Sequence, residues 1–369
     1  MKSEKILELS RLIVNYSIKM KENENVLIKA DIDSIPLVKA LIKTIHSNKG
    51  IPYVQLRDED IIRELMIDAK EQYFDKLSLW NETINKSIDS CISIYAEKND
   101  SYLEDVSIEI KKMAAVKLRK SSDIIIDQKK WVLLNYPTYG LAQKANMSYD
   151  RFFNYLLDVC TVNYEEMEKN LQPLKELMEK TDKVRIVGDE TDLTFSIKGI
   201  PAIICAGTAN LPDGEIYTAP IKTSVNGTIK YNTTSSYQGV VFKNIKLKFE
   251  NGKIIEATAD NNVDKLNQIL DTDEGARYIG EFALGVNPLI FHPMGDILFD
   301  EKIAGSLHFT PGQCYKGEAE NGNDSSIHWD LVLIQRPEYG GGEIYFDEVL
   351  IRKNGIFLDD KLKKLNFKQ

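Results

Sequence analysis

Side chains that can bind a metal or move a proton are concentrated in the C-terminal half of this sequence. Three of the four histidines of the chain lie there, and two of them, His308 and His328, fall among carboxylates in segments rich in glycine and turn residues. Imidazole and carboxylate together form the ligand set of a Zn, Co or Mn centre, and a carboxylate that bridges two ions builds a binuclear site. The pattern predicts the active site of a metal-dependent hydrolase. The candidate residues are Glu215, Glu281, Glu301, His308, Tyr315, His328 and Asp330.

Two of the candidate carboxylates occupy different local settings. Glu215 follows a Pro-Asp-Gly turn in NLPDGEIYTAP (210–220), so it lies where a loop enters a strand, a common place for a fixed ligand. Taken alone, it is more simply explained as an exposed turn glutamate. Glu281 lies among apolar residues such as Phe282 and Leu284, which predicts a buried backbone. A buried carboxylate is costly unless it is paired or metal-bound, so an ordinary ion pair remains the alternative.

The histidine segments supply the other candidates. His308 alternates with apolar residues in a strand-like run, where a hydrogen-bonded core histidine is the simpler explanation of a single residue. His328 and Asp330 are two positions apart, so in a strand both side chains point to one face and can reach one ion. An isolated pair of this kind is a weak signal. Glu301 and Tyr315 flank His308, and Tyr315 alone would be taken as structural.

Several other functional classes find no support in the sequence. Neither GxxxxGK[ST] nor GxGxxG occurs, so a nucleotide site is not indicated, and HExxH is also absent. His46 lies at the edge of an expected helix face and His292 in an expected loop, and neither joins the candidate cluster.

The bulk composition is that of an ordinary globular protein. The chain has 369 residues, of which 43% are hydrophobic and 28% charged, enough for two domains. A net charge of −9 argues against nucleic acid or an anionic membrane surface as partner. The four cysteines form no CxxC pair, and the N-terminus is too charged for a signal peptide. These features lead us to expect a cytoplasmic location.

The hydrophobic pattern predicts an α/β protein of two parts. Strand, helix and strand within residues 25–56 form a βαβ unit, so we expect an N-terminal domain, residues 1–183, with a largely parallel sheet. From residue 184 to 369, apolar and polar residues alternate between turns, which indicates a β-rich α+β domain that binds the metal. The other expected N-terminal strands are 91–96, 123–127 and 131–136, and the expected helices there include 149–160 and 163–181.

Several long motifs in order resemble the metallo-aminopeptidases of the aminopeptidase T and aminopeptidase S family. The resemblance extends over nearly the whole chain. The motifs are KWVLLNYPTYGLAQKANMS (130–148), NLPDGEIYTAP (210–220), DEGARYIGEFALGVNP (273–288), LFDEKIAGSLH (298–308) and IHWDLV (327–332).

This resemblance implies an aminopeptidase with two divalent ions per chain, acting on short peptides with a free N-terminus. Carried over by position, it makes Glu215, Glu281, His308, His328 and Asp330 the metal ligands. Glu301 matches another acid at or beside the metals, although the interval of seven residues to His308 is two longer than in the aminopeptidase T form. Tyr315 keeps the family spacing. The family fold, an α/β domain followed by a β-rich metal domain, is assembled as a homodimer.

The roles within the site remain open at this point. Glu281 or Asp330 is the candidate bridging carboxylate, Glu301 or Glu281 the general base, and Tyr315 a metal ligand or an oxyanion donor. Zn, Co, Mn and Mg all suit this ligand set. The competing hypotheses are a binuclear phosphoesterase or amidohydrolase, and a non-catalytic scaffold of the same fold.

Overall fold

The computed structural model describes residues 2–237, 239–317 and 319–367, which form two compact units. The first unit comprises the chain up to Val162 together with Gly207–Pro212, and the second comprises Asn163–Ala206 and the chain from Asp213 onward. The domain boundary between residues 183 and 184 stays a prediction. In the division into compact units, helix α8 (Tyr164–Lys180) belongs with the second unit.

The first unit is built on a five-stranded sheet of order β2-β1-β3-β4-β8, in which every neighbouring pair is parallel. This arrangement confirms the parallel sheet expected from the βαβ pattern. Parallel neighbours need a crossover connection between them, and the predicted helix between two strands supplies it. The strands are β1 (Asn25–Asp31), β2 (Ile51–Arg57), β3 (Ser90–Tyr95), β4 (Lys130–Asn135) and β8 (Asn210–Leu211).

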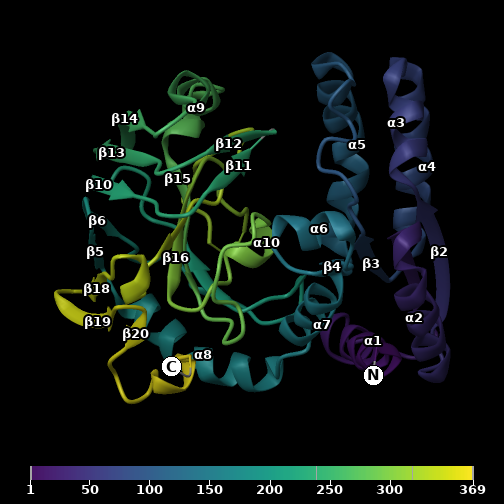
Figure 1. Cartoon of the computed structure of the whole chain (residues 1–369), viewed down its shortest axis with the longest axis horizontal. Helices are drawn as coiled ribbons and strands as arrows, with labels where there is room; N and C mark the ends of the chain where they lie inside the picture. Colours follow the sequence, from purple (N-terminus) through teal and green to yellow (C-terminus); the bar gives the residue numbers. More distant parts are fainter. Residues whose placement is uncertain (1, 238, 318, 368–369) are drawn as a thin grey trace. The chain divides into compact units, whose positions relative to one another are not determined.

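Helices connect and cover these strands (Figure 1). They are α1 (Lys2–Leu12), α2 (Ile35–Ser47), α3 (Glu59–Ile67), α4 (Glu71–Ser87), α5 (Ile108–Gln128), α6 (Tyr139–Lys144) and α7 (Tyr149–Cys160). Across the described ranges of both units, none of the helices combines the length and the apolar character that crossing a bilayer requires.

One strand expected from the sequence is wrong. Residues 123–127 belong to the last turns of α5, because Ile124 is buried and Ile125 packs beside Trp131 on the cluster around Cys91. The β-prone isoleucines there are held in a helix by tertiary packing, which overrides local propensity.

The second unit contains an eight-stranded antiparallel sheet, a five-stranded antiparallel sheet and a small two-stranded one. The eight-stranded sheet has the order β14-β13-β10-β6-β5-β18-β19-β20, the five-stranded sheet has the order β17-β16-β15-β9-β7, and β11 pairs with β12. Alternating burial along strands such as β6 explains why the sequence pattern identified them.

The strands of this unit are β5 (Lys183–Gly188), β6 (Thr191–Ser196), β7 (Ile203–Cys205), β9 (Glu215–Thr218), β10 (Asn226–Lys230), β11 (Ser235–Tyr237), β12 (Val240–Phe242), β13 (Lys246–Glu250), β14 (Lys253–Thr258), β15 (Ile279–Gly285), β16 (Ser306–Pro311), β17 (Val332–Ile334), β18 (Glu343–Phe346), β19 (Val349–Lys353) and β20 (Ile356–Phe357). Besides α8, its helices are α9 (Val263–Leu270) and α10 (Ile297–Asp300).

An aromatic layer joins the two large sheets of the second unit. Phe282 of β15 and Phe309 of β16 are directly opposite each other in the register, so both side chains lie on one face of the five-stranded sheet. Phe195 of β6 packs against both of them, with ring centroids 5.0 Å away in each case. In Figure 1, β15 and β16 lie inside this unit and the eight-stranded sheet lies at its left. The opposite face of β15 and β16 is therefore left for other side chains.

Truncating the aromatic layer should destabilise the second unit. Phe195 is 3% exposed, so Phe195→Ala leaves a cavity between the sheets. We expect its free energy of unfolding in urea to fall by about 3–5 kcal/mol. Val349→Ala, at a side chain that is 61% exposed, is the control and should change stability by less than about 0.5 kcal/mol. Equal, small effects of the two substitutions would contradict the packing described here.

Candidate metal centre

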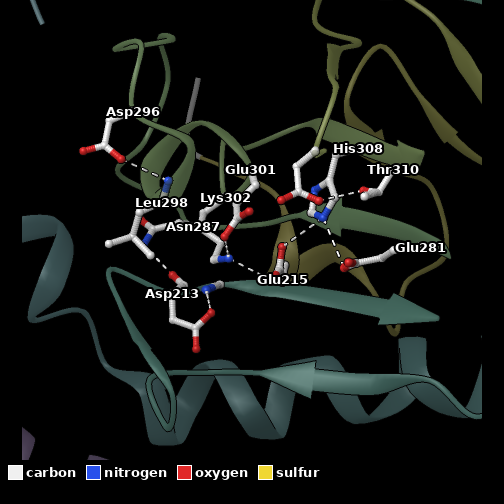
Figure 2. A network of polar contacts seen from close by, with 12 residues as sticks. Asp213, Glu215, Glu281, Asn287, Asp296, Leu298, Glu301, Lys302, His308 and Thr310 are labelled. Atoms are coloured by element: carbon white, nitrogen blue, oxygen red, sulfur yellow. Dashed lines mark hydrogen bonds and ion pairs between the residues drawn. The ribbon is translucent and has the colours of Figure 1, made fainter. Parts of the chain in front are cut away.

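Strand register brings three of the predicted residues to one face of the five-stranded sheet. Ala283 of β15 is opposite His308 of β16, and Gly285 of β15 is opposite Glu215 of β9. Glu281 lies on the same face, two positions before Ala283, because side chains alternate along a strand. Glu215, Glu281 and His308 therefore converge on the face opposite the aromatic layer (Figure 2).

Small residues leave the space into which these side chains project. Ala283 and Gly285 lie between the acids and the imidazole on this face. A Cβ at Gly285 would come within 2.5 Å of the Ile303 carbonyl oxygen and within 2.8 Å of the Glu301 carbonyl oxygen. The turn that carries Glu301 is therefore packed directly on Gly285, an approach that a side chain would prevent.

Glu281 contacts both histidines of the cluster. Its Oε1 lies 3.3 Å from His308 Nε2, and its Oε2 lies 3.3 Å from His328 Nε2. The Glu281 side chain is 3% exposed and that of His308 is 1% exposed. The second acid at His308 is Glu215, whose Oε2 lies 3.6 Å from the same Nε2. One buried carboxylate thus connects two imidazoles.

His328 and Asp330 lie in an extended segment just before β17 and approach each other as expected. His328 Nε2 is 3.2 Å from Asp330 Oδ1. His328 Nδ1 is 2.8 Å from the Gln313 carbonyl oxygen, which can only accept a hydrogen bond, so Nδ1 carries the proton. That hydrogen bond fixes the imidazole with Nε2 towards the cluster. Thr310 Oγ1 donates to Asp330 Oδ1 at 2.7 Å and orients the carboxylate.

Glu301 immediately follows the short helix α10 and joins the cluster from a turn. The next residue, Lys302, has no exposed side-chain surface, and its Nζ lies 2.8 Å from Glu215 Oε1 and also pairs with Glu301 Oε1 (Figure 2). Glu301, His308 and Asp330 offer ligand atoms that all lie within 4.8 Å of one another. The structure therefore brings Glu301 to the site despite its longer interval to His308.

Tyr315 lies at the edge of the cluster. Its ring centroid is 5.3 Å from that of His328 and 4.9 Å from that of Tyr217, and the residue is 49% exposed. The two remaining histidines do not take part. His46 is exposed in the last turn of α2, and His292 is exposed with Nδ1 at 3.0 Å from the hydroxyl of Tyr339.

The crowding of negative charge shifts the proton affinities of the cluster. Burial, reinforced by the charges of Glu215 and Asp330, raises the pKa of Glu301 to about 8, although Lys302 opposes the shift. Burial lowers the pKa of His308, but its contacts with Glu281 and Glu215 outweigh burial and raise it to about 9. Burial raises the pKa of Asp330, but the neighbouring His328 more than compensates and holds it well below its usual value. These carboxylates require positive charge nearby.

The possible metal ligands of the site form overlapping groups. Glu215, Glu281 and His308 form one group whose ligand atoms lie within 4.8 Å of one another, and Glu281, His328 and Asp330 form another. Glu281 belongs to both. Mixed carboxylate and imidazole donors at this spacing suit a divalent cation.

Sequence reasoning missed Lys302, although a signal was present. The lysine stands in the run Phe299-Asp-Glu-Lys-Ile-Ala304, where apolar residues on both sides indicate a buried segment. A buried lysine beside a buried glutamate implies an internal ion pair. Thr310 and Gln313, which orient Asp330 and His328, carry no comparable signal in the sequence.

The fold and the cluster of acids and histidines define a protein that can bind a divalent metal, and comparison with known proteins gives its family. A sequence model of the thermophilic metalloprotease family M29 matches residues 2–357. The chain therefore belongs to this metalloprotease family, as the resemblance in its motifs predicted. Divalent metal binding is implied by membership of the family.

Individual relatives agree with this assignment. Aminopeptidase 2 of Geobacillus stearothermophilus is 24% identical over 379 residues, covering 88% of this chain and 90% of the relative. Aminopeptidase T of Thermus thermophilus is 36% identical over 142 residues, which is 34% of each protein. The solved structure of wild-type AmpT from Thermus thermophilus matches with a TM-score of 0.79 and 21% identity, covering 96% of this chain and 99% of that chain. The last comparison establishes the fold.

The stability of the metal-free protein should fall as pH rises from about 4.5 to about 9. The raised pKa of His308, about 9 against an ordinary 6.5, gives stability that is complete below pH 6.5 and is lost as pH rises through 9. Glu301, with a pKa of about 8 against 4.5, acts in the same direction because the folded protein holds its proton longer. Urea titrations of chelated protein across this pH range measure the change, and a flat or rising profile would contradict it.

Proposed function

We propose that this chain is an aminopeptidase that removes N-terminal residues from short peptides with the help of two divalent ions. The observation that carries the proposal is the position of Glu281, which lies 3.3 Å from an imidazole nitrogen on either side of it. A carboxylate that contacts two imidazoles through different oxygens has the geometry of a ligand shared by two ions. The relatives named aminopeptidases support the choice of substrate.

The residues present fit a pair of divalent cations. Glu215 Oε2 and His308 Nδ1 are buried polar atoms without a hydrogen-bond partner among the described residues. Glu281, Glu301 and Asp330 add three more carboxylates, and Lys302 is fully buried beside two of the four acids. Such a concentration of buried negative charge is stable only when cations balance it. Zn, Co, Mn and Mg all remain compatible with the donor set.

We assign the ligands from the two groups that share Glu281. Glu215, Glu281 and His308 would hold one ion, and Glu281, His328 and Asp330 the other. Glu281 rather than Asp330 would be the acid common to both ions, because Glu281 contacts both histidines through separate oxygens. When bound, the ions would supply an activated water at neutral pH and polarise the scissile carbonyl group.

In the proposed reaction, Glu301 transfers the proton of the attacking water and Tyr315 stabilises the oxyanion of the tetrahedral intermediate. Glu301 is the general base in preference to Glu281, whose two oxygens are both engaged with imidazoles. The Glu301 carboxylate offers an atom within 4.8 Å of the ligand atoms of His308 and Asp330, so it is placed to accept a proton from water and return it to the leaving amine. Tyr315 packs beside His328, and we assign its hydroxyl to donation towards the tetrahedral oxyanion.

We also propose that the protein is a homodimer in the cytoplasm. β2 is an edge strand of the first unit and exposes Ile51, Tyr53, Val54 and Leu56, a pattern that favours coverage by another chain.

All four cysteines are free, which suits a reducing compartment such as the cytoplasm. Sedimentation at micromolar concentration tests the first point, where a monomer would refute it, and cell fractionation tests the second.

The class of reaction is tested by substrate choice. The protein supplied with Zn, Co, Mn or Mg should hydrolyse aminoacyl-p-nitroanilides and leave p-nitrophenyl phosphate unchanged. Chelation should abolish turnover, and mass spectrometry should find two ions per chain after metal supplementation. Fewer than one ion per chain would favour a scaffold, and phosphatase activity alone would favour a phosphoesterase.

Removing the shared ligand should abolish activity without unfolding the protein. Glu281→Gln and His328→Ala should each lower kcat/KM by more than about 100-fold, because even partners that only orient a ligand cost 10–100-fold. The exposed residues Glu256 and His46 provide matched controls, Glu256→Gln and His46→Ala, which should retain activity. Circular dichroism checks that each variant is folded. Full activity in either site variant would remove the assignment.

A further inference from the structure

Lys302 is a fully buried cation in contact with two of the proposed metal-site acids. Its Nζ lies 2.8 Å from Glu215 Oε1 and forms a second ion pair with Glu301 Oε1, and its side chain is 0% exposed (Figure 2). Burying an ammonium group is costly unless carboxylates surround it. The lysine is therefore paired with these two acids and has no contact with solvent.

The backbone holds Lys302 in this position. Its carbonyl oxygen accepts a hydrogen bond from Asn287 N at 3.0 Å, and its own N–H donates to the Phe299 carbonyl oxygen at 3.0 Å. The Asn287 side chain in turn donates to the Asp213 carbonyl oxygen at 2.7 Å, within the turn that precedes Glu215. The lysine and the strand that carries Glu215 are thus fixed to one another.

The contact with Lys302 gives the two carboxylate oxygens of Glu215 different surroundings. Oε1 is held by Lys302, whereas Oε2 is buried, has no hydrogen-bond partner among the described residues and faces His308 Nε2 at 3.6 Å. The ammonium group occupies a lone pair of Oε1 and neutralises its charge, so Oε2 is the better donor to a metal. Glu301 is held through a single oxygen in the same way.

Lys302 also accounts for a fourth group of possible ligand atoms. Cys205, Asp213 and Glu215 offer atoms within 4.8 Å of one another, which would otherwise suit a further cation. Lys302 interacts electrostatically with all three of these residues. Its ammonium group already serves as the cation on that side of Glu215, and the His308 side is left for divalent ions.

We infer that Lys302 is a positioning residue, which reserves one oxygen of Glu215 and one of Glu301 so that each acid presents a single oxygen to the metal site. This inference rests on the proposed two-ion function. It assigns Lys302 no contact with substrate, so its effect must pass through the two carboxylates.

Metal affinity measured by calorimetry with Co²⁺ or Zn²⁺ tests this role independently of turnover. Lys302→Met keeps the length of the side chain and removes its charge. We expect a 10–100-fold weaker affinity, about the cost of losing a residue that orients a ligand, and an altered visible spectrum of bound Co²⁺. We also expect kcat to fall more than KM changes. Lys230→Met removes a lysine paired with Glu190 elsewhere in the same unit and should match wild type.

A double variant gives the sharper test and removes both members of the buried pair, which favours folding. In Glu215→Gln, the ammonium of Lys302 needs an acceptor and captures the only side-chain oxygen, so the amide NH₂ faces the metal site. Adding Lys302→Met releases that oxygen to rotate towards the metal. The double variant should therefore bind metal about tenfold more tightly than Glu215→Gln alone, a gain of the size expected for an orienting contact.

These experiments distinguish a failure of the proposed two-ion function from a failure of the role assigned to Lys302. A wild-type protein that binds no metal would overturn the proposed function itself. A wild type that binds two ions, with a double variant no tighter than Glu215→Gln, would overturn the role of Lys302 alone. An unchanged Co²⁺ spectrum and affinity in folded Lys302→Met would do the same.

Discussion

Four carboxylates gathered at one place, two of them buried and two largely covered, are the electrostatic constraint on which the second unit depends. Glu215, Glu281, Glu301 and Asp330 lie close together, and their charges repel one another strongly in a medium that screens less than water. Two imidazoles, one ammonium group and the proton held by Glu301 compensate this charge in the metal-free protein. Metal ions that displace these protons would be bound by the same carboxylates, so the acidity of the cluster and its affinity for metal have a common origin.

The two faces of β15 and β16 have different roles, and packing on one face offsets the cost of burying charged groups on the other. One face is aromatic and packs against the eight-stranded sheet through Phe195, which supplies burial energy next to the charged cluster. The other face alternates ligands with Ala283 and Gly285. Because the strand period is two, a shift of register by a single residue would exchange the faces and destroy both.

Much of this organisation follows from the sequence, and its limits have physical reasons. Alternation around His308 was sufficient to predict a strand, the apolar surroundings of Glu281 predicted a buried backbone, and the parallel sheet followed from the βαβ pattern. The isoleucines of residues 123–127 were misleading, because their helix is selected by packing that no local pattern encodes. Glu301 and Lys302 reach the site from a turn, and the geometry of a turn cannot be obtained from periodicity.

The close approach at Gly285 has a consequence for how related sequences should be sorted. The turn bearing Glu301 and Lys302 rests on a position where even one methyl group would collide with backbone atoms. A gene copy could keep all the acids and histidines and still lose its catalytic arrangement through a change at this glycine. A search that checks only the metal ligands would then count such an inactive copy as an enzyme. Checking for glycine at the position of Gly285 would distinguish the inactive copy from an active enzyme.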